Sequence, residues 1–184
     1  MKPADMTEST IDSRRVYEGR LLKINSDRVR LPDGAESSRE YVVHPGAVAI
    51  IPILADGRVV MERQYRYPHK RHFIEFPAGK IDPGEDILAT AKRELEEETG
   101  YQAANWVHLT TIHPLIAYSD EKIEIFVARE LSMTRQTLDA GEFLEVFEAD
   151  PAEALCWVRE GKISDVKTII GLFWLDKLSG GAWP

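Results

Sequence analysis

The stretch RELEEETGY, residues 93–101, places four glutamates within five positions: Glu94, Glu96, Glu97 and Glu98. Like charges three or four residues apart on a helix repel each other, and acidic side chains near a helix C-terminus oppose the helix dipole. Carboxylate oxygens gathered in this way suit Mg²⁺ or Mn²⁺, and magnesium also binds substrate phosphates. The cluster therefore predicts a divalent-metal site for phosphate chemistry, and an ordinary solvated helix end is the alternative.

The segment that carries these glutamates is expected to be a helix, because its apolar residues from Ile87 to Leu95 recur at helical spacing. Asp86 is the favoured N-cap, with Asp82 as the alternative. Gly100 is a typical residue just past a helix end. The sequence thus predicts where the acidic helix begins and ends.

The four glutamates do not share one face of this helix. At 100° per residue, Glu98 continues the buried stripe and Glu94 lies on its edge. Glu96 falls on the opposite side, where a solvated charge is the better interpretation. Glu97 lies between, one turn after Arg93, so a structural ion pair and a metal role both stay open for it.

The rest of the chain predicts strands and two late helices around the acidic helix. An antiparallel meander is expected from residue 16 onward, and the apolar run 47–54 is expected to be a central strand buried on both faces. Residues 73–80 are expected to be one short strand entering a loop. The two final helices should begin at Pro151 and at the N-cap Ser164. We predict an α/β (α+β) fold: a mixed β-sheet sandwiched by helices, with an N-terminal antiparallel β meander.

Composition narrows the possible partners. The net charge is −8, so broad attraction to nucleic acid or to an anionic membrane is not expected. Cys156 is the single cysteine, which excludes a disulfide framework within the chain. Neither a signal peptide nor a long apolar run is evident, so the expected location is the cytoplasm.

Residues 79–101 carry a more specific pattern. Five residues separate Gly79 from Glu85, and seven more separate Glu85 from the group REL at 93–95, which is followed by EE at 97–98 and GY at 100–101. At every specified position this spacing resembles the Nudix box. The likeness continues outside the box, through RQYRY, IEFPAGKID, IHPLIAYSDEKIEIF and GEFLEV, to the ADP-ribose pyrophosphatase branch of Nudix hydrolases. It covers residues 16–178.

The resemblance implies Mg²⁺-dependent hydrolysis of ADP-ribose to AMP and ribose 5-phosphate, with Mn²⁺ as a possible replacement. It also implies two regions, an N-terminal meander for dimerisation at 1–45 and a Nudix hydrolase domain at 46–184. Carried over residue by residue, the resemblance implies the metal ligands Glu94, Glu97, Glu98 and the carbonyl of Ala78, the catalytic residues Glu142 and Glu97, the substrate-binding residues Arg39, Glu40, Arg66, Glu75 and Glu121, and the structural residues Gly79, Glu85, Arg93 and Gly100.

Several of these assignments have competitors. Asp139, Glu145 and Glu121 are alternative general bases to Glu142. Arg66 could be a surface cation, and strand alternation could expose Glu75 harmlessly. The chain also departs from relatives that hold adenine between N-terminal tryptophans, because its first tryptophan is Trp106. Tyr17 and Tyr41 are the residues that could contact adenine in their place, and a different substrate preference is the alternative.

Three other functions compete with ADP-ribose hydrolysis. GDP-mannose or another nucleotide sugar is the nearest rival substrate. An isopentenyl diphosphate isomerase would need a catalytic cysteine, whereas Cys156 falls in an apolar helix and is expected to be packing. A non-catalytic nucleotide- or RNA-binding module would be expected to lack some of the box glutamates, and all are present here.

Overall fold

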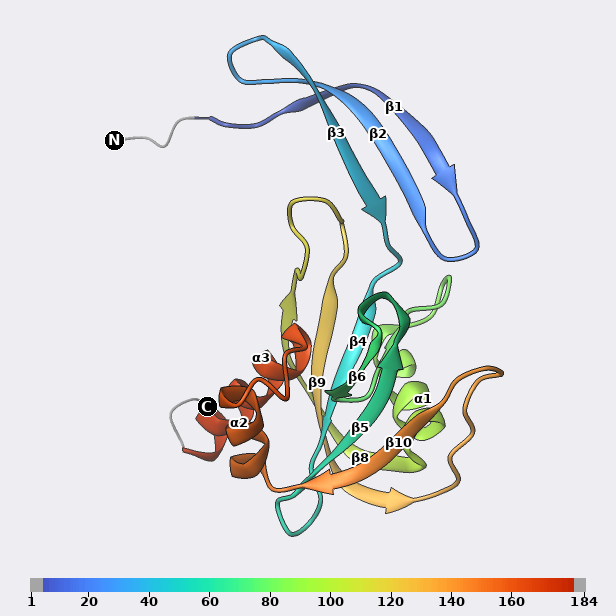
Figure 1. Ribbon diagram of the computed structural model, residues 1–184, viewed down its shortest axis with the longest axis vertical. Coiled ribbons are helices and arrows are strands. Elements are labelled where there is room, and N and C mark those ends of the chain that lie inside the picture. The colour runs from blue at the N-terminus through green and yellow to red at the C-terminus, as the bar shows by residue number, and fades with distance from the viewer. Residues whose placement is uncertain (1–4, 181–184) are drawn as a thin grey trace. The chain divides into compact units, whose positions relative to one another are not determined.

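The computed structural model describes residues 5–180, and its elements are labelled in Figure 1. The chain divides into two compact units. One unit contains the described residues up to Pro45 together with Leu115–Lys122. The other contains Gly46–Pro114 and the described residues from Ile123 onward. Each unit is described by itself below.

The first unit is the predicted antiparallel meander, although its first strand begins at Ser9 and not at residue 16. Its strands are β1 (Ser9–Glu18), β2 (Lys23–Arg30) and β3 (Glu36–Val43), paired in the order β1-β2-β3. Segment 115–122 belongs to this unit because the Val42 N–H donates to the Tyr118 carbonyl at 2.9 Å and the Asp120 N–H donates back to Val42 at 3.2 Å. No local pattern predicted that this second segment would join the meander, since it lies far along the chain.

The second unit contains two sheets. A four-stranded sheet has the order β7-β4-β9-β8, in which β4 and β9 run parallel and the other neighbours are antiparallel. A three-stranded antiparallel sheet has the order β10-β5-β6. The predicted mixed sheet is therefore confirmed. The strands are β4 (Ala47–Pro52), β5 (Val59–Arg66), β6 (Arg71–Glu75), β7 (Ala78–Lys80), β8 (Tyr101–Ile112), β9 (Ile123–Met133) and β10 (Leu144–Ala149), with a 3₁₀ turn at Tyr67–His69.

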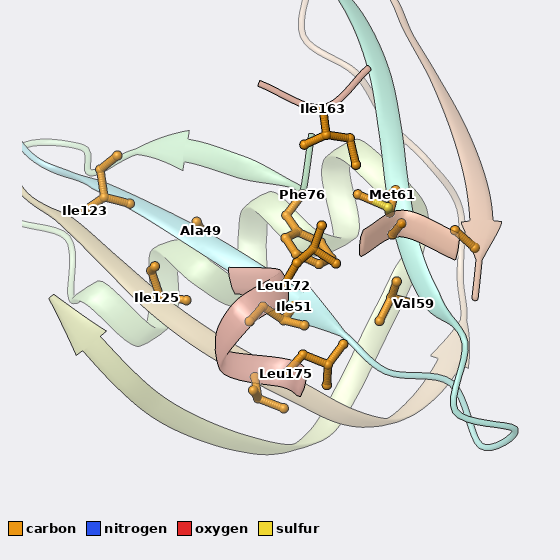
Figure 2. Close-up of a cluster of buried hydrophobic side chains, with 13 residues drawn as sticks. Ala49, Ile51, Val59, Met61, Phe76, Ile123, Ile125, Ile163, Leu172 and Leu175 are labelled. Atoms are coloured by element: carbon orange, nitrogen blue, oxygen red, sulfur yellow. The ribbon is translucent and has the colours of Figure 1, made fainter. Parts of the chain in front are cut away.

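Strand β4 is buried on both faces, as its uninterrupted apolar run predicted. Ala49 and Ile51 pack into one cluster with residues of α3 (Val166–Ser179), including Leu172, which Figure 2 shows in close-up. Val48 and Ile50 pack on the other face against residues of α1 (Ile87–Thr99). In Figure 1, α3 and α2 (Pro151–Arg159) accordingly lie on one side of the strands and α1 on the other. The sandwich of helices around the sheet is confirmed.

Two local predictions were wrong. Residues 73–80 do not form one strand: β6 ends at Glu75 and β7 begins at Ala78, in a different sheet. Pro77 lies between them, and a proline cannot donate a ladder hydrogen bond. The N-cap of α3 is Asp165 and not Ser164, because the Asp165 carboxylate accepts from the Thr168 N–H at 3.0 Å and from its hydroxyl at 2.7 Å.

Helix α2 begins at Pro151, as predicted, after the N-cap Asp150. Over residues 5–180, the structure contains no helix with the combined length and apolar character that crossing a lipid bilayer requires.

Candidate active site

Helix α1 positions the acidic cluster. Its N-cap is Asp86, whose carboxylate accepts from the Leu88 N–H at 3.0 Å and from the Ala89 N–H at 3.1 Å. Gly100 ends the helix in the left-handed conformation, with φ of 72°. Both ends lie where the sequence predicted them, so each glutamate points in the direction about the helix axis that the helical spacing predicts.

Glu98 is the most deeply buried of the four helix glutamates, with 4% of its surface exposed. Its Oε2 accepts from the Ala78 N–H of β7 at 2.9 Å. Burial, with the nearby charge of Glu62 as the next cause, raises the pKa of Glu98 well above its usual value. Helix and strand β7 are thus joined through one carboxylate, beside the Ala78 carbonyl that the resemblance implies as a ligand.

Gly79 makes room for the carboxylate of Glu94. A Cβ atom at position 79 would overlap the Cδ and both oxygens of Glu94, so any side chain there would displace that carboxylate. Burial raises the pKa of Glu94, although the neighbouring Arg93 opposes the shift. The first glycine of the motif therefore has a steric reason that spacing alone did not reveal.

Arg93 connects the carboxylates that flank the site. It donates to both oxygens of Glu85, at 3.0 and 2.9 Å, and Nη1 donates to Glu94 at 2.8 Å and to Glu97 at 3.0 Å. These bonds to Arg93, with one from Thr90, lower the pKa of Glu85 to about 2. Glu96 lies apart from them and accepts from Gln102 at 2.9 Å.

The Arg93 contacts have a consequence for metal binding. Within residues 5–180, no three His, Cys, Asp or Glu side chains converge closely enough to enclose a metal ion as they stand. Glu94 and Glu97 both point to the same guanidinium nitrogen. Each of these carboxylates gives one oxygen to Arg93, so its second oxygen is the one available to a cation.

A second set of charges lies at the end of strands β5 and β6. Arg66 donates through Nε and Nη2 to the two oxygens of Glu75, at 2.7 and 2.8 Å. Glu75 is 2% exposed and also receives the buried ammonium of Lys167, which donates to Asp165 at 3.0 Å as well. Harmless exposure of Glu75 is therefore wrong: burial would raise its pKa, but the two cations lower it.

Glu142 lies in the loop before β10, beside a hollow of about 420 Å³ lined by Gln64, Tyr65 and residues 139–143. Its Oε1 accepts from Gln64 Nε2 at 3.3 Å. Of the competing bases, Glu145 is bound to Arg63 at 2.6 and 2.9 Å, and Asp139 is exposed in the same loop as Glu142. Because Arg63 and Gln64 point to opposite faces of β5, Glu145 is directed away from Gln64 and Glu142.

The remaining candidates belong to the meander unit. Arg39 and Glu40 are exposed neighbours on β3, so their side chains point to opposite faces. Arg39 is paired with Glu8. Glu121 lies in segment 115–122, 3.8 Å from the His44 ring nitrogen. Glu121 therefore belongs to the same unit as Arg39 and Glu40, although it lies about 80 residues later in the chain.

Three residues that interact with the predicted site residues were not singled out from the sequence: Glu62, Gln64 and Lys167. Each contacts or electrostatically influences a predicted site residue. Glu62 and Gln64 could have been found from strand alternation with Arg66, since all three face the same way on β5. Lys167 carried no local signal, because its partner Glu75 is distant in sequence.

The chemistry of this donor set fits a divalent cation. The carboxylates of Glu94 and Glu98 lie against β7, the strand that bears the Ala78 carbonyl. Hard oxygen donors of this kind prefer Mg²⁺, Mn²⁺ or Ca²⁺. A guanidinium at Arg66 and an acidic loop at Glu142 lie in the same unit. Fold and site together define a phosphate-cleaving, metal-dependent hydrolase.

Comparison with known protein families leads to the same class of enzyme. The NUDIX domain matches residues 43–169, and the nucleoside diphosphate sugar hydrolase N-terminal domain matches residues 8–42. The chain therefore belongs to the Nudix hydrolase family, whose members generally use divalent metal ions.

Two curated relatives align along nearly the whole chain. The methanol dehydrogenase activator of Bacillus methanolicus is 42% identical over 171 residues, covering 92% of both chains. The ADP-ribose pyrophosphatase of Bacillus subtilis (strain 168) is 38% identical over 173 residues, covering 93% of this chain and 94% of the relative. A crystal structure of an ADP compounds hydrolase superimposes with a TM-score of 0.87 over 98% of each chain at 24% identity, which shows the shared fold.

Proposed function

We propose that this protein hydrolyses ADP-ribose to AMP and ribose 5-phosphate with Mg²⁺ as its metal ion. The observation that carries the proposal is the buried Glu98 held by the Ala78 N–H, beside a glycine that makes room for Glu94. The 38% identity to an ADP-ribose pyrophosphatase along nearly the whole chain supports the choice of substrate.

Glu94, Glu97, Glu98 and the Ala78 carbonyl would hold the metal. When bound, a divalent cation neutralises charge on the diphosphate and lowers the pKa of the attacking water. Arg66 uses two nitrogens for Glu75, and its third nitrogen can donate to a phosphate oxygen. Glu75 and Lys167 fix the direction of this guanidinium.

Glu142 is the proposed general base. Its loop is partly exposed and lies beside the hollow lined by Gln64 and Tyr65. Water attacks one phosphorus, its proton passes to the carboxylate, and the bridging oxygen leaves with the other phosphate. The neutral amide of Gln64 donates one hydrogen bond to Oε1 of Glu142, which leaves the second carboxylate oxygen able to accept that proton.

Dimerisation and a cytoplasmic location complete the proposal. The meander exposes large apolar side chains, including Val16, Tyr17, Leu21 and Leu22, and a three-stranded sheet gains stability by covering such a surface. A second copy of the chain is the proposed cover, with Arg39, Glu40 and Glu121 of the meander unit contributing to substrate recognition. Sedimentation at the monomer mass would exclude the dimer.

The first experiment measures phosphatase-coupled turnover of ADP-ribose, GDP-mannose, NADH and diadenosine polyphosphates with Mg²⁺, beside a Glu98→Gln control. Preference for ADP-ribose that disappears in the control is the expected result. Preference for GDP-mannose would replace ADP-ribose as the proposed substrate and leave the proposed hydrolysis mechanism unchanged. Nucleotide binding without turnover of any compound would favour a non-catalytic binding module.

A further inference from the structure

Glu62 is a fully buried carboxylate in the middle of strand β5. None of its surface is exposed, and neither of its carboxylate oxygens has a hydrogen-bond partner among the described residues. Buried ionisable groups are normally paired or bound to a metal, because an unpaired carboxylate loses its hydration without compensation. A structural role as a simple packing residue does not explain a glutamate at this position.

Strand geometry directs Glu62 toward the acidic site. Met61 and Val59 point into the cluster covered by α2 and α3 (Figure 2). Side chains alternate along a strand, so Glu62 points the other way, on the face that it shares with Gln64 and Arg66. Gln64 is the residue that binds Glu142.

The neighbouring cations are already committed to a different carboxylate. Glu62 lies directly opposite Glu75 in the β5–β6 ladder. Arg66 and Lys167 both donate to Glu75. One member of this glutamate pair is therefore fully satisfied by protein groups, and the other is not.

Glu62 is also electrostatically connected to the proposed ligand Glu98. Three residues after Glu75, the Ala78 N–H binds the Glu98 carboxylate. The charge of Glu62 is, after burial, the largest cause of the raised pKa of Glu98. Mutual repulsion between two buried carboxylates is relieved when a divalent cation lies between them.

We propose that Glu62 is an additional ligand of the metal site, binding a divalent cation together with Glu98, directly or through a coordinated water. The inference rests on the proposed function, because it assumes that Glu98 binds metal. It adds a ligand from strand β5 to the helix ligands of the Nudix box. Glu62 would then make metal-free protein less stable and metal binding tighter.

The test uses Mn²⁺ alone, without substrate, on the full chain. Glu62→Gln removes the charge at constant shape, and Glu62→Met removes it with an apolar side chain of similar length in case the amide prevents folding. The matched control is Glu153→Gln, which removes the same charge from an exposed position on α2. Calorimetric titration gives the affinity for Mn²⁺, and thermal unfolding gives Tm with and without it.

The expected result is an Mn²⁺ affinity lowered about 10- to 100-fold in both Glu62 variants, with a correspondingly smaller rise in Tm when Mn²⁺ is added. The control should match the wild type in Mn²⁺ affinity and in the rise in Tm that Mn²⁺ produces. A purely structural Glu62 would leave the affinity unchanged, so Mn²⁺ titrations that superimpose on the wild type would overturn the inference.

A Glu98→Gln variant separates this inference from the proposed function. Loss of Mn²⁺ binding in Glu98→Gln with normal binding in both Glu62 variants overturns the Glu62 inference alone. Wild-type protein that neither binds Mn²⁺ nor hydrolyses ADP-ribose overturns both. Weakened binding in the Glu62 variants and in Glu98→Gln supports both.

Discussion

Gly79→Ala should separate metal binding from folding. The new methyl group would occupy the space of the Glu94 carboxylate, which is the movable end of a flexible side chain. The backbone itself has no reason to move, since Gly79 lies in strand β7 without a positive φ. We expect Glu94 to leave the site while the fold remains.

The cost to stability can be worked out from these contacts. Moving Glu94 from its rotamer costs about 0.5–1.5 kcal/mol, and losing its bond to the half-buried Arg93 costs about 0.2–1 kcal/mol. Replacing glycine by alanine restores about 0.4–1 kcal/mol by restricting the unfolded chain. The net loss of about 1 kcal/mol should lower Tm by about 2–4 °C.

The cost to activity should be much larger. Loss of one carboxylate ligand is expected to lower kcat/KM for ADP-ribose by about 100-fold or more, which corresponds to about 2.7 kcal/mol of transition-state stabilisation. The assays are Mn²⁺ titration, thermal unfolding and steady-state turnover on one preparation.

Gly84→Ala is the matched control. Gly84 has φ of 81° and open space around its Cα, so alanine there costs about 1–2 kcal/mol of backbone strain without touching Glu94. Both variants should lose similar stability, and only Gly79→Ala should lose metal affinity. Normal Mn²⁺ affinity and turnover in Gly79→Ala would refute the role of Glu94.

Three further predictions concern other parts of the site. Glu142→Gln should lower kcat by about 100-fold or more with unchanged Tm and Mn²⁺ affinity, and full activity would remove Glu142 from the mechanism. Glu75→Gln should destabilise metal-free protein by about 1.5–3 kcal/mol, because buried Lys167 keeps Asp165 but loses one of its two carboxylate partners; an unchanged Tm would contradict this. Glu85 has a folded pKa of about 2 against 4.5 for the free side chain, so its stabilisation is present above pH 4.5 and is lost as pH falls toward 2. In Glu85→Gln, Tm should therefore fall less steeply between pH 4.5 and pH 2 than it does in the wild type. An equally steep fall in Tm would count against the Arg93–Glu85 pairing.

Local rules were sufficient for the acidic helix. The N-cap Asp86, the terminating Gly100 and the inward direction of Glu98 all follow from interactions within one turn or from helical spacing. The same kind of rule failed at α3, where Ser164 and Asp165 are adjacent cap candidates. Contacts of the Asp165 carboxylate with Lys167 and Thr168 decide between them, and these appear only in the folded chain.

The buried charges were beyond local rules. Alternation along β6 shows that Glu75 and Ile74 face opposite ways, but it cannot say which face is covered. Glu75 is buried because Arg66 and Lys167 converge on it, the latter from 92 residues away. Alternation along β5 places Glu62 on the same face as Arg66, but nothing in the run VVMERQYR shows that Glu62 is buried on that face and not solvated.

The two-part construction of the meander unit affects how the protein is made and rearranged. The His44 N–H binds the Asp120 carboxylate, 76 residues later in the chain. At about 5–20 residues per second, a ribosome needs about 4–15 seconds to supply that partner, so the meander emerges with part of its edge unpaired. Replacing residues 1–45 by those of a relative would pair the relative's β3 with the native segment 115–122, which evolved beside a different strand. Successful chimaeras are therefore expected to transplant both pieces together.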